Sequence, residues 1–342
     1  MEQFALIGVE DKENRYIKKH PVLRLLPTKW AEAMIPKTKP ILTDTIYVQD
    51  SKKELGYIMD VPGFFVEKKK IGDANRKKLI SNIVDLLVKN NIKTLVFPLW
   101  REFMSIEERG YLETNSIIML DGYFLRLLTL IMTLERIFSI PRVNPHIMEV
   151  GIWGADTRMG KVWAELLAPF LNYMTLGGEN TIVLEALSDK VLHKTGLSCS
   201  VTTDFRQCLG NKTLAILGEM PEDQSLINSK IVVFFGNLWN EDARIRNEEI
   251  GSIFMESGWP TIPDKLNVGN DLSLWDQIGV LEARIFMLDE TYRSLLLDGE
   301  ISIANIEKLK RILKDYDIID SSGMISNNEL LSYDSFRRLY FC

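Results

Sequence analysis

The chain has few cysteines, few histidines and no long apolar run, and each scarcity excludes a class of protein. Its cysteines are Cys199, Cys208 and Cys342, too sparse and odd in number for a disulfide framework, so reduced thiols are expected. The three histidines lie far apart, without the spacing of metal ligands, and no metal site is predicted. The most apolar stretch, residues 123–138, is interrupted by Arg126 and Glu135 and is too short to span a bilayer.

An excess of positive charge is also missing. The 41 Lys and Arg residues are outnumbered by 47 Asp and Glu, and the resulting net charge of −6 argues against a nucleic-acid-binding surface. The first twelve residues lack the basic and apolar regions of a secretory signal, so a cytoplasmic location is expected. Hydrophobic residues make up 46% of the 342, which is typical of a globular protein of about two domains.

The order of expected elements predicts an α/β fold with three segments. Residues 1–145 are predicted to form an α+β substrate domain, with a helix at 20–34, a hairpin at 44–59 and a helix at 75–90. Residues 146–270 are predicted to form a Rossmann-type domain around a parallel sheet, because short apolar strands alternate with helices. Its strands are expected at 148–153, 181–185, 197–202, 213–217 and 230–235, with a helix at 160–173. Residues 271–342 are expected to return as helices, at 272–297 and 302–316, that pack between the two domains.

The segment Val150–Val162 joins a predicted strand to a predicted helix through a glycine-containing turn. Gly154 and Gly160 fill the outer positions of the Gly-x-x-Gly-x-x-Gly spacing, and Thr157 stands at the middle position. Such a turn directs the free N–H groups of a helix N-terminus at a pyrophosphate. The predicted cofactor contacts here are Gly154, Ala155, Thr157, Arg158, Met159 and Gly160.

Three further residues are predicted to reach the cofactor. Glu185, at the end of the expected second strand, would accept hydrogen bonds from the ribose hydroxyls of NAD and repel the 2′-phosphate of NADP, so NAD is preferred. Gly218 and Gly236 follow two later strands and are expected at the same carboxyl edge, although ordinary turns explain them equally well. The alternative for the whole segment is a Rossmann-like sheet whose nucleotide site is empty or adapted.

With these elements in order, the chain resembles the cyanobacterial-type long-chain acyl-[acyl-carrier-protein] reductases and related predicted amino acid dehydrogenases, distant cousins of shikimate dehydrogenase. The resemblance runs over nearly the whole length, from Phe4–Gly8 through Val150–Val162 to Glu300–Glu307. It implies a nicotinamide cofactor bound by a Rossmann-type domain. Those reductases accept the acyl group on a cysteine, but the corresponding region, Leu281–Leu297, contains none and has Phe286 or Met287 instead.

Two groups of charged residues are candidates for substrate chemistry. The segment Lys68–Lys78 concentrates six positive charges and is predicted to dock an acidic carrier protein or a substrate phosphate, or simply to form a solvated helix face. The shikimate-type relatives pair a lysine with an aspartate for proton transfer, which points to Lys69 or Lys70 with Asp121. Asp121 is equally suited to cap the helix that follows it.

The sequence therefore predicts an NAD(P)-dependent oxidoreductase that transfers a hydride to or from a small carbonyl, alcohol or amine substrate. Two alternatives stay open. One is a non-catalytic relative that binds a nucleotide or a partner, and the other is an acyl-thioester reductase that works without a cysteine nucleophile. The sequence leaves the substrate, the direction of the reaction and the oligomeric state open.

Overall fold

Internal contacts divide the computed structural model into two units, which are described separately below. The N-terminal unit comprises residues 1–125 and 262–293, and the C-terminal unit comprises residues 126–261 and 294–342. The structure describes residues 3–8, 22–27, 30, 34, 38–49, 51–61, 73–221, 227–236, 252–268, 272–299, 301–318 and 321–341. The helix predicted at 20–34 lies mostly outside these residues. The three-segment division predicted from the sequence stays a prediction.

The N-terminal unit is built on a five-stranded sheet in the order β2-β3-β1-β4-β5. Its strands are β1 (Phe4–Leu6), β2 (Ile41–Tyr47), β3 (Glu54–Asp60), β4 (Thr94–Val96) and β5 (Ile118–Leu120). Strands β2 and β3 pair antiparallel, which confirms the predicted hairpin, and β3, β1, β4 and β5 run parallel. The helices that begin or lie in this unit include α4 (Asp73–Lys89), α5 (Trp100–Phe103), α6 (Ile106–Thr114), α7 (Tyr123–Phe138) and α13 (Leu274–Leu288).

Helix α13 lies directly against the parallel part of this sheet, where it contacts β1, β4 and β5. A Cβ added to Gly279 would stand 2.8 Å from the Val96 Cγ1 atom, so the small residue allows the helix to approach the sheet closely. The single helix predicted at 272–297 is in fact two helices, because α13 ends before Asp289 and α14 (Glu290–Asp298) follows. The Asp289 carboxylate accepts a hydrogen bond from the Tyr292 N–H (2.7 Å), which gives α14 its own N-terminal cap.

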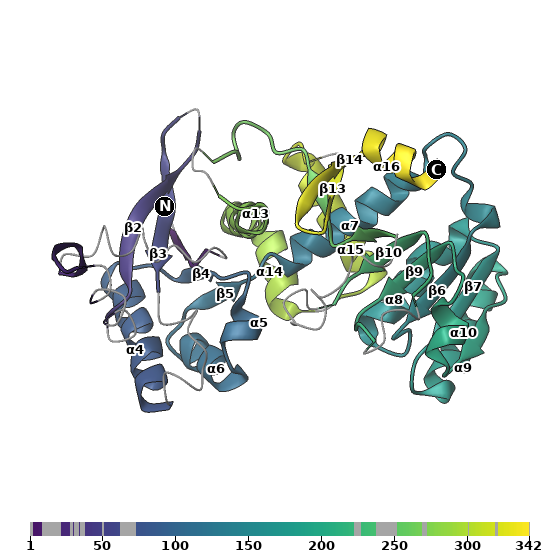
Figure 1. The fold of residues 1–342 in the computed structure, drawn as a ribbon, viewed down its shortest axis with the longest axis horizontal. Coiled ribbons are helices and arrows are strands. Elements are labelled where there is room, and N and C mark those ends of the chain that lie inside the picture. The colour runs from purple at the N-terminus through teal and green to yellow at the C-terminus, as the bar shows by residue number, and fades with distance from the viewer. Residues whose placement is uncertain are drawn as a thin grey trace. The chain divides into compact units, whose positions relative to one another are not determined.

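The C-terminal unit contains six parallel strands in the order β11-β10-β9-β6-β7-β8 (Figure 1). Their bounds are β6 (Glu149–Trp153), β7 (Tyr173–Gly177), β8 (Ser200–Thr202), β9 (Leu214–Leu217), β10 (Ile231–Phe234) and β11 (Ile253–Met255). Strands β9 and β10 are buried along their whole length, as expected for strands covered on both faces. Counted along the chain, the strands lie in the order 3-2-1-4-5-6, which defines the Rossmann fold and confirms the predicted α/β class.

The first two crossovers of this sheet correct the sequence prediction. The helix expected at 160–173 is α8 (Arg158–Leu167), followed by a short 3-10 turn at Ala168–Phe170, and Tyr173 already belongs to β7. The strand expected at 181–185 is wrong, because these residues begin helix α9 (Thr181–Thr195). The Asn180 side chain caps α9 by accepting a hydrogen bond from the Val183 N–H (3.2 Å).

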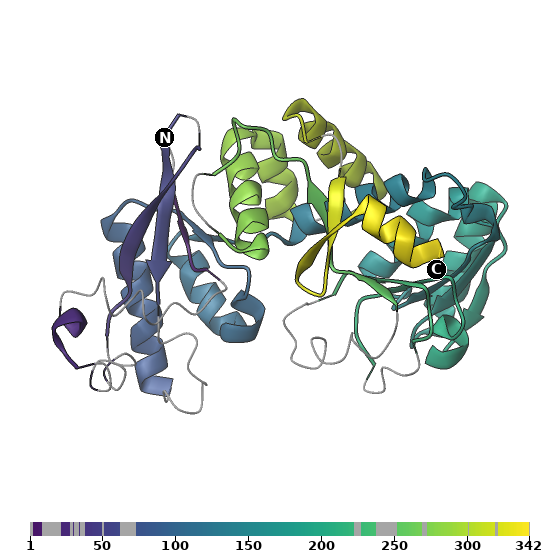
Figure 2. The same cartoon turned by 45° about the horizontal axis from the view of Figure 1, so that its top comes forward.

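The remaining elements include an antiparallel sheet and a last helix that are not clearly predicted from the sequence. An antiparallel sheet forms from β12 (Ser257–Pro260), β13 (Ser321–Ser326) and β14 (Glu329–Ser332), and helix α16 (Tyr333–Phe341) packs on β11, β13 and β14 (Figure 2). Helix α15 (Ile303–Asp315), predicted at 302–316, is confirmed, with Ser302 as its N-cap. Helix α10 (Phe205–Leu209) contacts β6 and β7. None of the helices described is long and apolar enough for a membrane crossing.

Candidate functional site

The turn between β6 and α8 brings the six predicted cofactor residues of Gly154–Gly160 together at the carboxyl edge of the sheet. Gly154 has φ +79°, a conformation that a side chain disfavours. A Cβ on Gly160 would overlap the Gly154 carbonyl oxygen and stand 2.6 Å from the Ala155 Cα atom. Helix α8 therefore starts in direct contact with the turn, and the approach requires glycine. The Ala155 N–H donates to the Gly177 carbonyl oxygen (2.9 Å), which fixes the turn to the end of β7.

Thr157 is the N-cap of α8, and its hydroxyl is engaged inside the turn. The hydroxyl donates to the Gly154 carbonyl oxygen (2.6 Å) and accepts from the Gly160 N–H (3.1 Å). The N–H groups of Arg158 and Met159, in the first turn of the helix, have no carbonyl one turn earlier to receive them. The first helical turn contains no acidic residue and begins with the exposed Arg158. Both the helix dipole and this guanidinium therefore favour an anion at the turn.

Asp156, which the sequence analysis did not select, ties this turn to the next one. Its Oδ2 atom accepts hydrogen bonds from the N–H groups of Glu179 and Asn180, each at 2.9 Å. A Cβ on Gly178 would stand 2.6 Å from the Asp156 Cγ atom, so the glycine allows the carboxylate to approach. The turns after β6 and β7 are therefore joined through the Asp156 carboxylate.

The acidic residue that follows the second strand differs from the one predicted. Glu185 is an exposed residue of α9 and does not follow a strand, so its assignment to the end of the second strand is wrong. The second strand is β7, and Glu179 comes two residues after it, exposed, 19 residues beyond Gly160. That spacing is close to the one found in dinucleotide-binding units. In the sequence, the pattern that indicates a strand end here is Gly177-Gly178-Glu179 directly after the mainly apolar Met174–Leu176.

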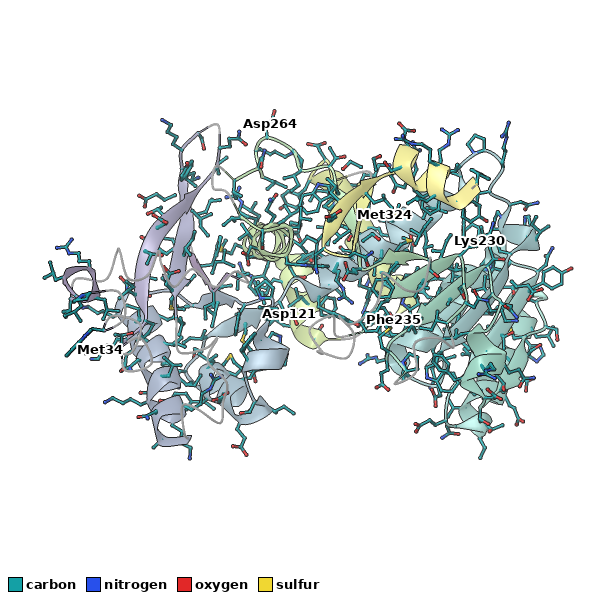
Figure 3. The ribbon with its side chains drawn as sticks, viewed as in Figure 1. Met34, Asp121, Lys230, Phe235, Asp264 and Met324 are labelled. Atoms are coloured by element: carbon teal, nitrogen blue, oxygen red, sulfur yellow. The ribbon has the colours of Figure 1, made fainter. Side chains whose placement is uncertain are left out.

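Gly218 and Gly236 follow β9 and β10 and lie against each other, at the edge where they were predicted. A Cβ on Gly236 would overlap the Gly218 carbonyl oxygen, and one on Gly218 would stand 2.7 Å from the ring of Phe235, labelled in Figure 3. The Arg126 guanidinium donates to the Gly236 carbonyl oxygen (2.8 Å). Close packing alone accounts for both glycines, and their contact with a cofactor stays a prediction.

In the N-terminal unit, Asp121 follows β5 at the carboxyl edge of the parallel strands and is labelled in Figure 3. Its Oδ2 atom accepts from the Trp100 indole N–H (2.8 Å), and its Oδ1 atom accepts from the Tyr123 N–H (3.0 Å). The second contact is the helix-capping role considered above. The buried Glu282 of α13 completes the cap, since it accepts from the N–H groups of Gly122 (2.8 Å) and Leu125 (2.9 Å).

Glu282 is a buried carboxylate whose pKa is strongly shifted. Burial and the neighbouring charge of Asp121 raise the pKa of its carboxyl group to about 8, although the backbone N–H groups oppose the shift. The buried Tyr292 hydroxyl has no hydrogen-bond partner in the described part of the chain, and burial and the Glu282 charge raise its pKa. The sequence pattern that could have identified Glu282 is a carboxylate at helical spacing from Ile278 and Ile285, which places it on the apolar face of the helix.

The predicted docking segment Lys68–Lys78 is only partly described. Lys69 and Lys70 lie outside the described residues, so the proton-transfer pair with Asp121 stays a prediction. Arg76 is buried, 6% exposed, and its guanidinium pairs with Glu108 (2.8 Å). It therefore belongs to the packing of α4 on α6 and not to a docking face, whereas Lys77 and Lys78 are exposed.

The two described cysteines are poor nucleophiles. Burial raises the pKa of Cys199 to about 11 and that of Cys208 to about 12, so both are thiols at neutral pH. Phe286 is buried in α13, where the resemblance places the acyl-accepting cysteine. Among the described residues, no group of three or more His, Cys, Asp or Glu side chains is arranged to hold a metal ion.

No protein-family model matches the chain, and no curated protein matches its sequence. Solved structures that match the chain in a structural comparison include L-tryptophan dehydrogenase from Nostoc punctiforme, at 11% identity and TM-score 0.40, covering 100% of this chain and 87% of that one. A chorismate mutase/shikimate 5-dehydrogenase fusion protein from Clostridium acetobutylicum has 11% identity and TM-score 0.27 over 92% and 98% of the chains. Anabolic ornithine carbamoyltransferase from Campylobacter jejuni subsp. jejuni has 11% identity and TM-score 0.28 over 68% and 74%. At these scores the likenesses carry no inference about activity.

Proposed function

We propose that the protein binds an NAD-type dinucleotide at the β6–α8 turn and uses it as an oxidoreductase on a small carbonyl, alcohol or amine. The observation that carries the proposal is the Gly160 contact: a helix N-terminus packed so tightly on its turn that a Cβ has no room, in a parallel sheet of Rossmann order. The same close approach of helix to turn directs the helix N–H groups at a pyrophosphate in dinucleotide-binding units.

The residues at the turn fit such a cofactor. The N–H groups of Arg158 and Met159 and the Arg158 guanidinium would hold the pyrophosphate, and the exposed Glu179 carboxylate would accept the ribose hydroxyls. A bound nicotinamide would supply the hydride chemistry. No arginine lies between Glu179 and Gly196 to receive a 2′-phosphate, so NAD is the expected cofactor and NADP the weaker ligand.

Asp121 is the proposed proton carrier for the substrate. It lies at the carboxyl edge of the N-terminal sheet, where ligands of parallel sheets bind, and the Trp100 indole holds its carboxylate in one orientation. The absence of a cysteine from Leu281–Leu297 disfavours an acyl-enzyme route. A thioester substrate would therefore have to be reduced directly.

A non-catalytic relative is the second candidate, and it also has a specific observation in its favour. Thr157 already accepts the Gly160 N–H, and the Asp156 carboxylate brings negative charge to the turn. Both features make the site less open to a pyrophosphate than a turn with three glycines. The oxidoreductase requires that a dinucleotide binds, and turnover of the bound cofactor with a substrate separates it from a relative that only binds a nucleotide or a partner.

The test is a fluorescence titration of NADH and NADPH into wild type, Glu179→Gln and Glu185→Gln. Both substitutions remove one exposed carboxylate charge, but only Glu179 follows the second strand, so Glu185→Gln is the matched control. We expect the preference of wild type for NADH to fall about tenfold or more in Glu179→Gln, because charged hydrogen bonds are lost, and to be unchanged in Glu185→Gln. Absence of NADH binding to wild type would overturn the proposal, and equal effects of the two substitutions would overturn the role of Glu179.

A further inference from the structure

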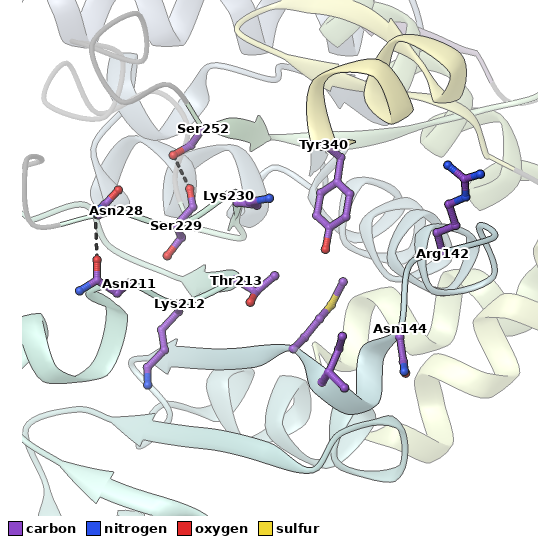
Figure 4. Close-up of a pocket in the computed structure, with 12 residues that line it drawn as sticks. Arg142, Asn144, Asn211, Lys212, Thr213, Asn228, Ser229, Lys230, Ser252 and Tyr340 are labelled. Atoms are coloured by element: carbon purple, nitrogen blue, oxygen red, sulfur yellow. Dashed lines mark hydrogen bonds between the residues drawn. The ribbon is translucent and has the colours of Figure 1, made fainter. Parts of the chain in front are cut away.

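A second candidate site lies at the opposite, amino-terminal edge of the six-stranded sheet. A cavity of about 480 Å³ opens there, lined by residues that immediately precede four strands: Met148 before β6, Thr213 before β9, Lys230 before β10 and Ser252 before β11 (Figure 4). Because all six strands are parallel, this edge is the one remote from the Gly154–Gly160 turn. Its volume suits a small ligand.

The cavity is basic in an acidic protein. Its described lining includes Arg142, Lys212 and Lys230 and no Asp or Glu, although the whole chain carries a net charge of −6. Lys212 is paired with Glu149 (3.3 Å), beside the cavity. Within the described part of the chain, no carboxylate forms an ion pair with Arg142 or Lys230. Two cationic side chains therefore remain for an anion.

An aromatic ring and a rigid polar wall complete the cavity. The Lys230 ammonium lies 5.3 Å from the centre of the Tyr340 ring, and Figure 4 shows the Tyr340 hydroxyl directed toward the middle of the cavity. The Asn228 amide donates to the Asn211 side chain (3.0 Å), and the Ser252 hydroxyl donates to the Ser229 carbonyl oxygen. These bonds join the segments that precede β9, β10 and β11.

We propose that this cavity binds a small phosphate monoester. The cations and hydroxyl groups that line the cavity come from separate segments, before β6, β9 and β10 and from α16. A tetrahedral dianion with three free oxygens satisfies donors arranged in this way, whereas a planar carboxylate offers two oxygens in one plane. The site is independent of the dinucleotide proposal, because it shares no residue with the glycine turn.

The experiment is calorimetric titration of ribose 5-phosphate into the full chain at constant ionic strength, with ribose and succinate as probes that lack the phosphate. Lys230→Gln removes the ammonium and keeps a polar side chain, one atom shorter. Lys308→Gln, an exposed lysine of α15 outside the cavity, is the matched control for loss of charge. Arg158→Gln removes the cation at the glycine turn, the other place at which a phosphate has a favourable environment.

We expect wild type to bind ribose 5-phosphate with a dissociation constant below about 1 mM and to bind ribose and succinate more weakly. Lys230→Gln should weaken binding about tenfold or more, since a charge-assisted contact is lost, while Lys308→Gln and Arg158→Gln should leave it unchanged. The proposal is overturned if wild type shows no saturable binding, or if succinate binds as tightly. It is also overturned if Arg158→Gln abolishes binding and Lys230→Gln does not.

Discussion

Replacing Gly160 by alanine tests the packing on which the dinucleotide site depends. The added Cβ would overlap the Gly154 carbonyl oxygen and lie 2.6 Å from the Ala155 Cα atom, and neither backbone atom can rotate away. Helix α8 must then move off its turn. Overpacking of a core costs about 1–3 kcal/mol, and we expect about 3 kcal/mol here because the neighbours are backbone. For a unit of this size the midpoint of thermal unfolding should fall by about 6–12 °C.

Two other glycines provide controls, because their added Cβ atoms meet nothing within 4 Å. Gly110→Ala, inside α6, should stabilise the protein by about 0.5–1 kcal/mol through higher helix propensity. Gly196→Ala should cost about 1 kcal/mol, since φ +79° at that helix end strains a side chain. Urea unfolding followed by circular dichroism measures all three variants. The reasoning is refuted if Gly160→Ala unfolds at the wild-type urea concentration, or if it costs less than Gly196→Ala.

Three further predictions concern Thr157, the cysteines and Glu282. Thr157→Gly releases the Gly160 N–H from the threonine hydroxyl and should strengthen NADH binding about tenfold in a fluorescence titration, and weaker binding would contradict the assigned turn geometry. Any dehydrogenase activity should survive the triple substitution Cys199→Ala, Cys208→Ala and Cys342→Ala. The pKa values of Cys199 and Cys208 are raised to about 11 and about 12, so neither is a thiolate nucleophile at neutral pH. An acyl adduct on a cysteine, found by mass spectrometry, would contradict this. Burial raises the pKa of Glu282 to about 8, so the folded protein binds a proton that the unfolded chain releases above about pH 4.5, and stability should fall as the pH rises from 5 to 8. Glu282→Gln should flatten that decline in urea unfolding at pH 5 and pH 8, and an equal decline in both proteins would disprove the assignment.

The sequence predicted the sheets better than the crossovers between them. Fully apolar runs such as Leu214–Leu217 and Ile231–Phe234 have few readings other than buried parallel strands, and both are strands in the structure. Thr181–Glu185 is apolar in part as well, but Leu184, Leu187 and Val191 form the buried face of α9 at helical spacing. The helix cap at Asn180 and the pair Gly177-Gly178 before it indicate that the strand ends earlier, and it lies at Tyr173–Gly177.

In the candidate site, contacts between residues close in sequence were predicted and contacts between distant residues were not. The contacts of Gly154–Gly160 are local, so spacing alone located them. Asp156 bonds to residues 23 and 24 positions later, and Glu282 bonds to N–H groups about 160 residues earlier. No sequence period links partners at such separations. Arg76 was misjudged for the same reason, since its burial depends on Glu108, on another helix.

The most direct measurement of the central claim is a crystal structure of the protein grown with NADH. The proposal predicts density for the pyrophosphate within hydrogen-bond distance of the Arg158 and Met159 N–H groups, with the adenosine ribose on the Glu179 carboxylate. A dinucleotide bound anywhere else, or an empty β6–α8 turn in crystals saturated with NADH, would contradict it.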